Sequence, residues 1–133
     1  IYLLFSMKKK EFCTTNGYIK HVGVHLIIEL WNGRNLTSIP KIRKALKSCV
    51  KACGVTLLKI NLHKFSPSGG ITGVAIIKES HISIHTWPEY EYAALDIFLC
   101  GNLDPYRSIP VLKKEFNTKN IQVMEFKRGI LEK

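Results

Sequence analysis

Apolar residues along this chain follow two periods. One is the two-residue alternation of a β-strand, and the other is the 3.6-residue spacing of an amphipathic helix. Alternation, or short apolar runs closed by turn residues, predicts strands at residues 23–31, 58–62, 73–78, 81–86, 93–100 and 121–126. A segment rich in glycine, serine and proline, residues 65–70, is expected to be the loop between the second and third strands.

The helical spacing is found between Ser38 and Gly54. Ser38 suits an N-cap, Pro40 suits the first turn, and Gly54 suits the residue after the last turn. The expected inward face consists of Ile42, Ala45, Leu46, Cys49, Val50 and Cys53. Lysines occupy the opposite face, so we expect an amphipathic helix that packs on a sheet.

A second helix is expected within residues 104–116. Asp104 and Pro105 form a pair typical of a helix cap and first position. Pro110 is unfavourable in a helix interior, so a start near Ser108 is the alternative.

These elements give the order βαββββαβ. Two helices are too few to cover both faces of a parallel sheet. The expected fold class is therefore α+β, a two-layer sandwich with a mostly antiparallel sheet and its helices on one face. Residues 1–133 are expected to form a single domain. We interpret residues 1–22 as an N-terminal extension and lead-in, because Met7 begins a sequence that resembles a bacterial start.

One face of the sheet is expected to carry polar chemistry. Strand alternation places Ile82 and Ile84 on one face and the polar residues His81, Ser83 and His85 on the other. In residues 93–100 the same alternation separates Leu95, Ile97 and Leu99 from Asp96, Phe98 and Cys100. A face of histidines, serine, carboxylate and thiol either meets water or builds a site.

Composition narrows the function classes. The formal net charge is +10, but the basic residues are scattered and no aromatic platform or recognition-helix motif accompanies them. No apolar run approaches the roughly 20 residues of a membrane helix, and the apolar start is too short for a signal peptide. We therefore expect no nucleic-acid partner, no membrane partner and a cytoplasmic location.

Metal and hydrolase sites find little support in the sequence. His81 and His85 are four residues apart, which on a strand separates them by about 13 Å, so no metal site is expected. Ser80 lacks the G-x-S-x-G elbow, and Cys100 with His85 lacks a local thiol-protease signature. The cysteines form no C-x-x-C pair, and Cys49 and Cys53 are interpreted as core thiols.

The dipeptide Glu79-Ser80 suggests that the chain cuts itself. A serine hydroxyl can attack the carbonyl of the preceding residue and convert the amide into an ester. If the ester then eliminates, the chain breaks between residues 79 and 80 and Ser80 becomes an N-terminal pyruvoyl group. That ketone is an electrophile that no ordinary side chain offers, and the chain would supply its own cofactor.

The residues around this junction form a long motif. It comprises E-S-H-I-S-I-H-T-W-P-E at 79–89, Y-E-Y-A-A-L-D-I-F-L-C-G at 90–101, G-V-H-L-I-I-E at 23–29 and E-F-K-R-G at 125–129. The motif closely resembles the prokaryotic S-adenosylmethionine decarboxylases, a family of self-processing, pyruvoyl-dependent enzymes. The resemblance runs from about Gly23 to Gly129, nearly the whole chain.

The resemblance implies a set of processing and catalytic residues. Ser80 matches the pyruvoyl precursor, with cleavage after Glu79. His85 matches the histidine that assists processing, and Thr72 matches a hydroxyl that does the same. Cys100 matches the thiol that returns a proton to the product. The substrate amine would form a Schiff base with the pyruvoyl group, which accepts electrons as carbon dioxide leaves.

The resemblance also implies substrate contacts and a partner. Glu89 matches a carboxylate that binds ribose hydroxyls, and Phe65 matches an aromatic that stacks on adenine. The expected substrate is S-adenosylmethionine, in polyamine biosynthesis, and the expected assembly is a homodimer of cleaved protomers. Glu91 stands where the family commonly has glycine, and the 67–73 loop is one residue longer than usual. An added carboxylate there could meet a cationic side chain, so L-ornithine or L-arginine is the alternative substrate.

A different class of function is also open at this stage. The chain could be an unprocessed, inactive homologue that acts as a regulatory partner of an active subunit. The intact Ser80, His85 and Cys100 argue for an enzyme.

Overall fold

A computed structural model of the chain describes residues 20–131. The strands are β1 (Lys20–Trp31), β2 (Thr56–Lys64), β3 (Ile71–Lys78), β4 (Ser80–Trp87), β5 (Tyr92–Cys100) and β6 (Asn120–Leu131). The α-helices are α2 (Ile39–Cys53) and α3 (Ser108–Glu115), and two short 3₁₀ turns are η2 (Pro88–Tyr90) and η3 (Pro105–Arg107). The order βαββββαβ expected from the sequence is confirmed.

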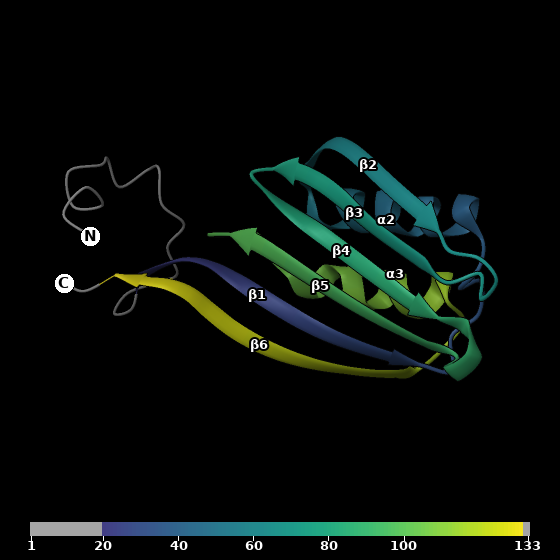
Figure 1. The fold of residues 1–133 in the computed structure, drawn as a ribbon. Helices are drawn as coiled ribbons and strands as arrows, with labels where there is room; N and C mark the ends of the chain where they lie inside the picture. The colour runs from purple at the N-terminus through teal and green to yellow at the C-terminus, as the bar shows by residue number, and fades with distance from the viewer. Residues whose placement is uncertain (1–19, 132–133) are drawn as a thin grey trace.

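The six strands form one sheet in the order β2-β3-β4-β5-β1-β6. Every pair of neighbouring strands is antiparallel. Both α-helices lie on the same face of this sheet, which gives the expected two-layer α+β sandwich (Figure 1). The opposite side of the sheet carries no helix among the described residues, and we call it the open face.

Helix α2 has the ends that its sequence predicts. The Ser38 hydroxyl accepts a hydrogen bond from the Lys41 backbone N–H at 3.3 Å, and Pro40 lies in the first turn. Gly54 closes the helix with φ of 70°, a left-handed conformation that glycine adopts without a steric penalty. All six apolar residues expected on the inner face are buried.

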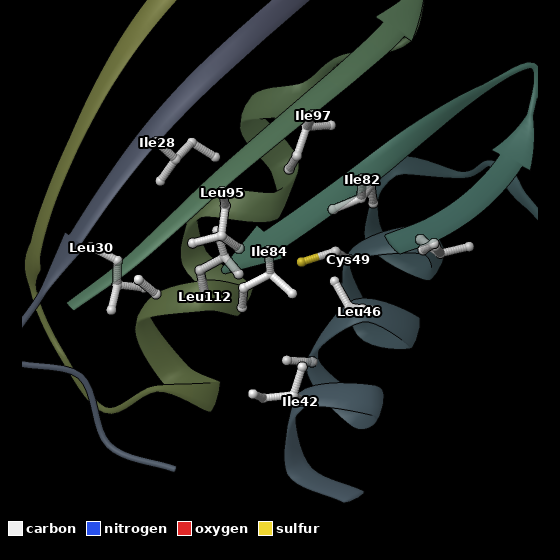
Figure 2. Packing of buried hydrophobic residues seen from close by; sticks show 14 of the residues in the cluster. Ile28, Leu30, Ile42, Leu46, Cys49, Ile82, Ile84, Leu95, Ile97 and Leu112 are labelled. Carbon is white, nitrogen blue, oxygen red and sulfur yellow. The ribbon is translucent and has the colours of Figure 1, made fainter. Parts of the chain in front are cut away.

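The core lies between the helices and the sheet. Figure 2 shows side chains of α2, among them Leu46 and Cys49, facing Ile84 of β4, with Leu112 of α3 beside them. Burial raises the pKa of the Cys49 thiol, and burial raises the pKa of Cys53 to about 11. Both cysteines are therefore unreactive core thiols at neutral pH, as expected.

Two elements differ from the simple periodic pattern. Leu58 is 62% exposed, because the register between β2 and β3 shifts between Leu57 and Lys59 and turns the Leu58 side chain outward. In the last third of the chain Asp104 caps the 3₁₀ turn η3, and the α-helix begins at Ser108. Pro110 thus lies in the first turn of α3, where a missing N–H is tolerated.

None of the helices in residues 20–131 is long and apolar enough to cross a membrane. Met7 and Cys13 lie outside the described residues.

Replacing Gly23 with alanine is expected to destabilise the fold by about 1–3 kcal/mol, because added atoms in a packed site force its neighbours to move. Gly23 pairs with Cys100, and a Cβ at this position would overlap the Leu99 carbonyl oxygen and lie 2.7 Å from Cε1 of Phe98. Urea unfolding of Gly23→Ala measures the change. A variant as stable as the parent chain would show that β1 and β5 can separate here without cost.

Candidate functional site

The open face collects the polar side chains that strand alternation assigned to it. Side chains of β4 and β5 that point away from the helices include His81, Ser83, His85, Asp96 and Cys100, and all are half-buried or exposed. Between them, on the helix side, Ile82, Ile84, Leu95 and Ile97 are buried. The separation of the two faces is confirmed.

Glu79 and Ser80 lie at one end of the sheet. Glu79 is the single residue between β3 and β4 and is exposed, and Ser80 begins β4 opposite Ile77. Cys100 ends the neighbouring strand β5, two residues beyond Phe98, the partner of His81. Residue 80 and Cys100 thus lie near each other on adjacent strands, and we call Ser80 and Cys100 the cleavage end.

Four other site residues line a hollow of about 250 Å³. They are Phe65, Thr72, His85 and Glu89, and we call them the hollow end. Thr72 and His85 face each other across β3 and β4, with 3.1 Å between Oγ1 and Nδ1. The Thr72 hydroxyl and the His85 imidazole, both expected to assist processing, are therefore hydrogen-bonded neighbours.

Backbone turns and one buried threonine shape the hollow. The Phe65 N–H donates to the Gly70 carbonyl at 2.8 Å, which closes the loop that presents the Phe65 ring. Thr86 is buried, and its hydroxyl accepts from the Ile71 N–H and donates to the Leu36 carbonyl, each at 2.8 Å. Pro88 starts the η2 turn that carries Glu89 to the rim. Thr86 was not singled out from the sequence, where a threonine in a strand carries no distinctive signal.

The two ends are far apart in one protomer. Ser80 and His85 are separated by five residues of β4, about 16 Å. His85 pairs with Ala94, and Cys100 lies six residues further along β5, about 20 Å away. One protomer therefore does not bring His85 to the residue it is expected to process, and a Cys100–His85 nucleophile pair within one chain is excluded.

Glu91 does not line the hollow. Its carboxylate accepts a hydrogen bond from Nη1 of Arg34 at 2.8 Å, and its carbonyl accepts from the Gly33 N–H at 3.0 Å. Its φ of 50° is left-handed, a conformation that explains why glycine suits this position. The pairing with Arg34 leaves Glu91 as a contact between two loops.

A charged group at the centre of the open face was only partly foreseen. Asp96 accepts hydrogen bonds from His25, His81 and Ser83. Burial alone would raise the pKa of Asp96, but these hydrogen bonds outweigh it and hold the pKa below its usual value. Alternation placed His81, Ser83 and Asp96 on one face, but only strand pairing brings His25 to them. His81 is hydrogen-bonded to Asp96, whereas Nδ1 of His85 contacts the Thr72 hydroxyl.

Comparisons with known proteins agree with this fold. The sequence model of the family described as S-adenosylmethionine decarboxylase matches residues 24–129. The S-adenosylmethionine decarboxylase proenzyme of Methanococcus maripaludis strain C5 is 51% identical over 117 residues, which cover 86% of this chain and 95% of that protein. The corresponding proenzyme of Thermomicrobium roseum is 40% identical over 114 residues, covering 85% and 98% of the two chains.

A solved structure is also similar. The crystal structure of the adenosylmethionine decarboxylase from Aquifex aeolicus superposes with a TM-score of 0.73 at 33% identity. The match covers 86% of this chain and 96% of that one.

Proposed function

The chain belongs to the S-adenosylmethionine decarboxylase family and is a decarboxylase, and we propose that it removes carbon dioxide from S-adenosylmethionine with a pyruvoyl group made from its own Ser80. The observation that carries the proposal is the motif at 79–89, which combines a cleavable Glu79-Ser80 junction with two residues of the hollow, His85 and Glu89. Two relatives that are 51% identical over 117 residues are named proenzymes, a term for chains that need processing.

The position of the junction suits self-cleavage. Glu79 is exposed in a one-residue connection, so breaking the chain there leaves β3 and β4 whole and paired. The Ser80 hydroxyl attacks the Glu79 carbonyl, and the amide becomes an ester. Removal of the Ser80 α-proton then expels the Glu79 carboxylate, and hydrolysis of the remaining dehydroalanine releases ammonia and leaves the pyruvoyl group.

The pyruvoyl group would supply a ketone that condenses with the substrate amine and accepts electrons as carbon dioxide leaves. The chain's own residues bind the substrate and move its protons. Cys100, on the strand next to residue 80, donates a proton to the substrate carbon. Glu89 accepts hydrogen bonds from the two ribose hydroxyls, since a carboxylate has acceptors for both. Phe65, which is 48% exposed, offers a ring face to adenine.

These roles require the cleavage end and the hollow end to lie next to each other. A homodimer can bring the cleavage end of one protomer to the hollow end of the other. The open face carries exposed apolar side chains that water would not favour, among them Trp31, Ile76, Trp87, Met124 and Phe126. Two open faces stacked about 10 Å apart would cover these side chains. We assign the second copy of this chain as the partner.

The symmetry of such a dimer decides what meets what. If the two-fold axis lies between the stacked sheets and crosses the strands, the partner's strands are turned end for end. The cleavage end of each protomer then faces the hollow end of the other. Each dimer then has two composite sites. In each site the Ser80 junction of one protomer lies near the partner subunit's His85, whereas the two residues are far apart within one protomer.

The hollow favours the nucleoside substrate over a plain amino acid. The carboxylate on its lining belongs to Glu89, beside the Phe65 ring. Glu91, the residue that suggested ornithine or arginine, is engaged by Arg34.

A carbon dioxide release assay tests the substrate. Offered S-adenosylmethionine, ornithine, arginine and lysine separately, the protein is expected to decarboxylate S-adenosylmethionine alone. Glu89→Gln is expected to raise KM for it by roughly 10–100-fold, the cost of losing a charged hydrogen-bond acceptor. Glu125→Gln, an exposed change on β6, is the matched control. Faster release from ornithine or arginine would establish the amino-acid alternative, and no release from any substrate would establish an inactive homologue.

A further inference from the structure

The centre of the open face holds a hydrogen-bonded group that the proposed function has not used. Nε2 of His25 lies 2.6 Å and Nε2 of His81 lies 2.8 Å from the same Asp96 oxygen, Oδ2. The Ser83 hydroxyl donates to the other oxygen, Oδ1. Because Asp96 accepts from three donors while half-buried, it ties β1, β4 and β5 together by side chains. We call Asp96, His25, His81, Ser83 and Arg128 the Asp96 network.

Arg128 extends the network to β6. Its Nη1 lies 3.5 Å from Nδ1 of His25, and its guanidinium lies 5.2 Å from the centre of the Phe98 ring. An arginine can only donate, so this contact favours the His25 tautomer with its proton on Nε2. That tautomer is the one that donates to Asp96. The network therefore has a consistent direction of donation from Arg128 through His25 to the carboxylate.

The distances describe hydrogen bonds and not a metal centre. The ligand atoms of His25, His81 and Asp96 lie within 4.8 Å of one another. Two ligands of a tetrahedral zinc stand about 3.3 Å apart, since each is about 2.0 Å from the ion. The nitrogen–oxygen separations of 2.6 and 2.8 Å are shorter and match charge-assisted hydrogen bonds.

The location of His81 connects the Asp96 network to the cleavage end. His81 directly follows Ser80, and Asp96 lies on the same strand as Cys100. Before cleavage, position 80 is held from both sides by the β3–β4 connection. After cleavage, position 80 is a chain end without its backbone N–H, and chain ends fray unless they are tied down. His81 is then the first complete residue of the new chain.

We propose that the Asp96 network anchors the chain end that self-cleavage creates, and so holds the reacting position 80 beside Cys100. This inference rests on the proposed function, because the chain end exists only after cleavage. His81 and Asp96 act as positioning residues, through the backbone of residue 81. A displacement of about 1 Å between reacting groups can lower a rate by about 100-fold, so a loose anchor affects turnover strongly.

The first test is Asp96→Asn in the full-length protein. An amide offers one acceptor oxygen, so it cannot serve both the histidines and Ser83. The variant is expected to be cleaved like the parent chain and to titrate with phenylhydrazine, a ketone reagent, at one equivalent per chain. Its kcat is expected to fall by about 10–100-fold while KM changes by less than about threefold, because the hollow end is untouched. Asp104→Asn removes the same charge outside the network and is the control.

A pair of His81 variants separates anchoring from simple loss of packing. His81→Gln keeps an N–H donor that can reach Asp96, and it is expected to retain most of the kcat. His81→Leu fills the same space without a donor and is expected to lose kcat as Asp96→Asn does. This pair also decides the matter if Asp96→Asn fails to fold.

Two outcomes would overturn the anchor. One is an unchanged kcat in both Asp96→Asn and His81→Leu. The other is a block of cleavage in these variants, which would assign the network to processing. Failure of the proposed function is distinguishable from both, because it is seen in the unmodified protein as one uncut chain that does not react with phenylhydrazine.

Discussion

Ser80→Ala is expected to leave the chain in one piece and to abolish carbon dioxide release. Alanine has no hydroxyl to attack the Glu79 carbonyl, so neither the ester nor the ketone can form. Denaturing electrophoresis should show the fragments 1–79 and 80–133 for the parent protein and a single full-length band for the variant. The loss of activity should be complete, because no other residue at the cleavage end supplies a ketone.

The fold should survive this change, since Ser80 is at a strand end and outside the buried core. Circular dichroism and thermal unfolding check that the variant is folded. Ser48→Ala, which removes a hydroxyl from the outer side of α2, is the control and should be cleaved normally. Carbon dioxide release from purified, folded Ser80→Ala would refute the pyruvoyl mechanism, and cleavage of that variant would refute the serine as the attacking group.

A heterodimer of Ser80→Ala and His85→Ala chains is expected to recover activity that neither homodimer has. Each homodimer lacks one component at both of its composite sites, so neither should be cleaved. In the heterodimer, the intact Ser80 of the His85→Ala chain faces the intact His85 of its partner. That site should cleave its chain after Glu79 and decarboxylate the substrate. Because one of the two sites is intact, the dimer should have about half of the parent activity.

Two different affinity tags allow the heterodimer to be isolated after co-expression, and electrophoresis should show that only the His85→Ala chain is cut. The matched control pairs Ser80→Ala with Cys100→Ala. Both changes lie at the cleavage end. Each composite site takes its cleavage end from one protomer, so each of the two sites contains one of the changes and activity should remain absent. Cleavage of no chain in the first heterodimer would contradict the composite site and require both ends within one protomer.

Much of the fold could be predicted because its elements are specified locally. Ser38, Pro40 and Gly54 act on their own neighbours in the chain, so the ends of α2 followed from the sequence. Alternation likewise assigned Ile82 and Leu95 to the core and His81 and Asp96 to the open face. The exposure of Leu58 did not follow from alternation, because the register shift in β2 depends on its pairing with β3.

The candidate site was less predictable, because it depends on which strands are neighbours. Thr72 and His85 meet because β3 and β4 are consecutive and paired. His25 meets Asp96 only because β1 inserts between β5 and β6, a pairing of segments far apart in the chain. The sequence suggested that Glu91 could contact a cationic substrate. In the structure its carboxylate pairs instead with Arg34, which comes from a distant loop.

The sequence by itself identified the groups on which the proposed chemistry rests: a serine after a glutamate carbonyl, a thiol, a threonine hydroxyl and an imidazole, and a carboxylate and an aromatic ring. Those identities are covalent and need no fold to be recognised. Only the tertiary structure decided where they stand. Because a strand advances about 3.3 Å per residue, the five residues from Ser80 to His85 place the cleavage end and the hollow end at opposite ends of one sheet.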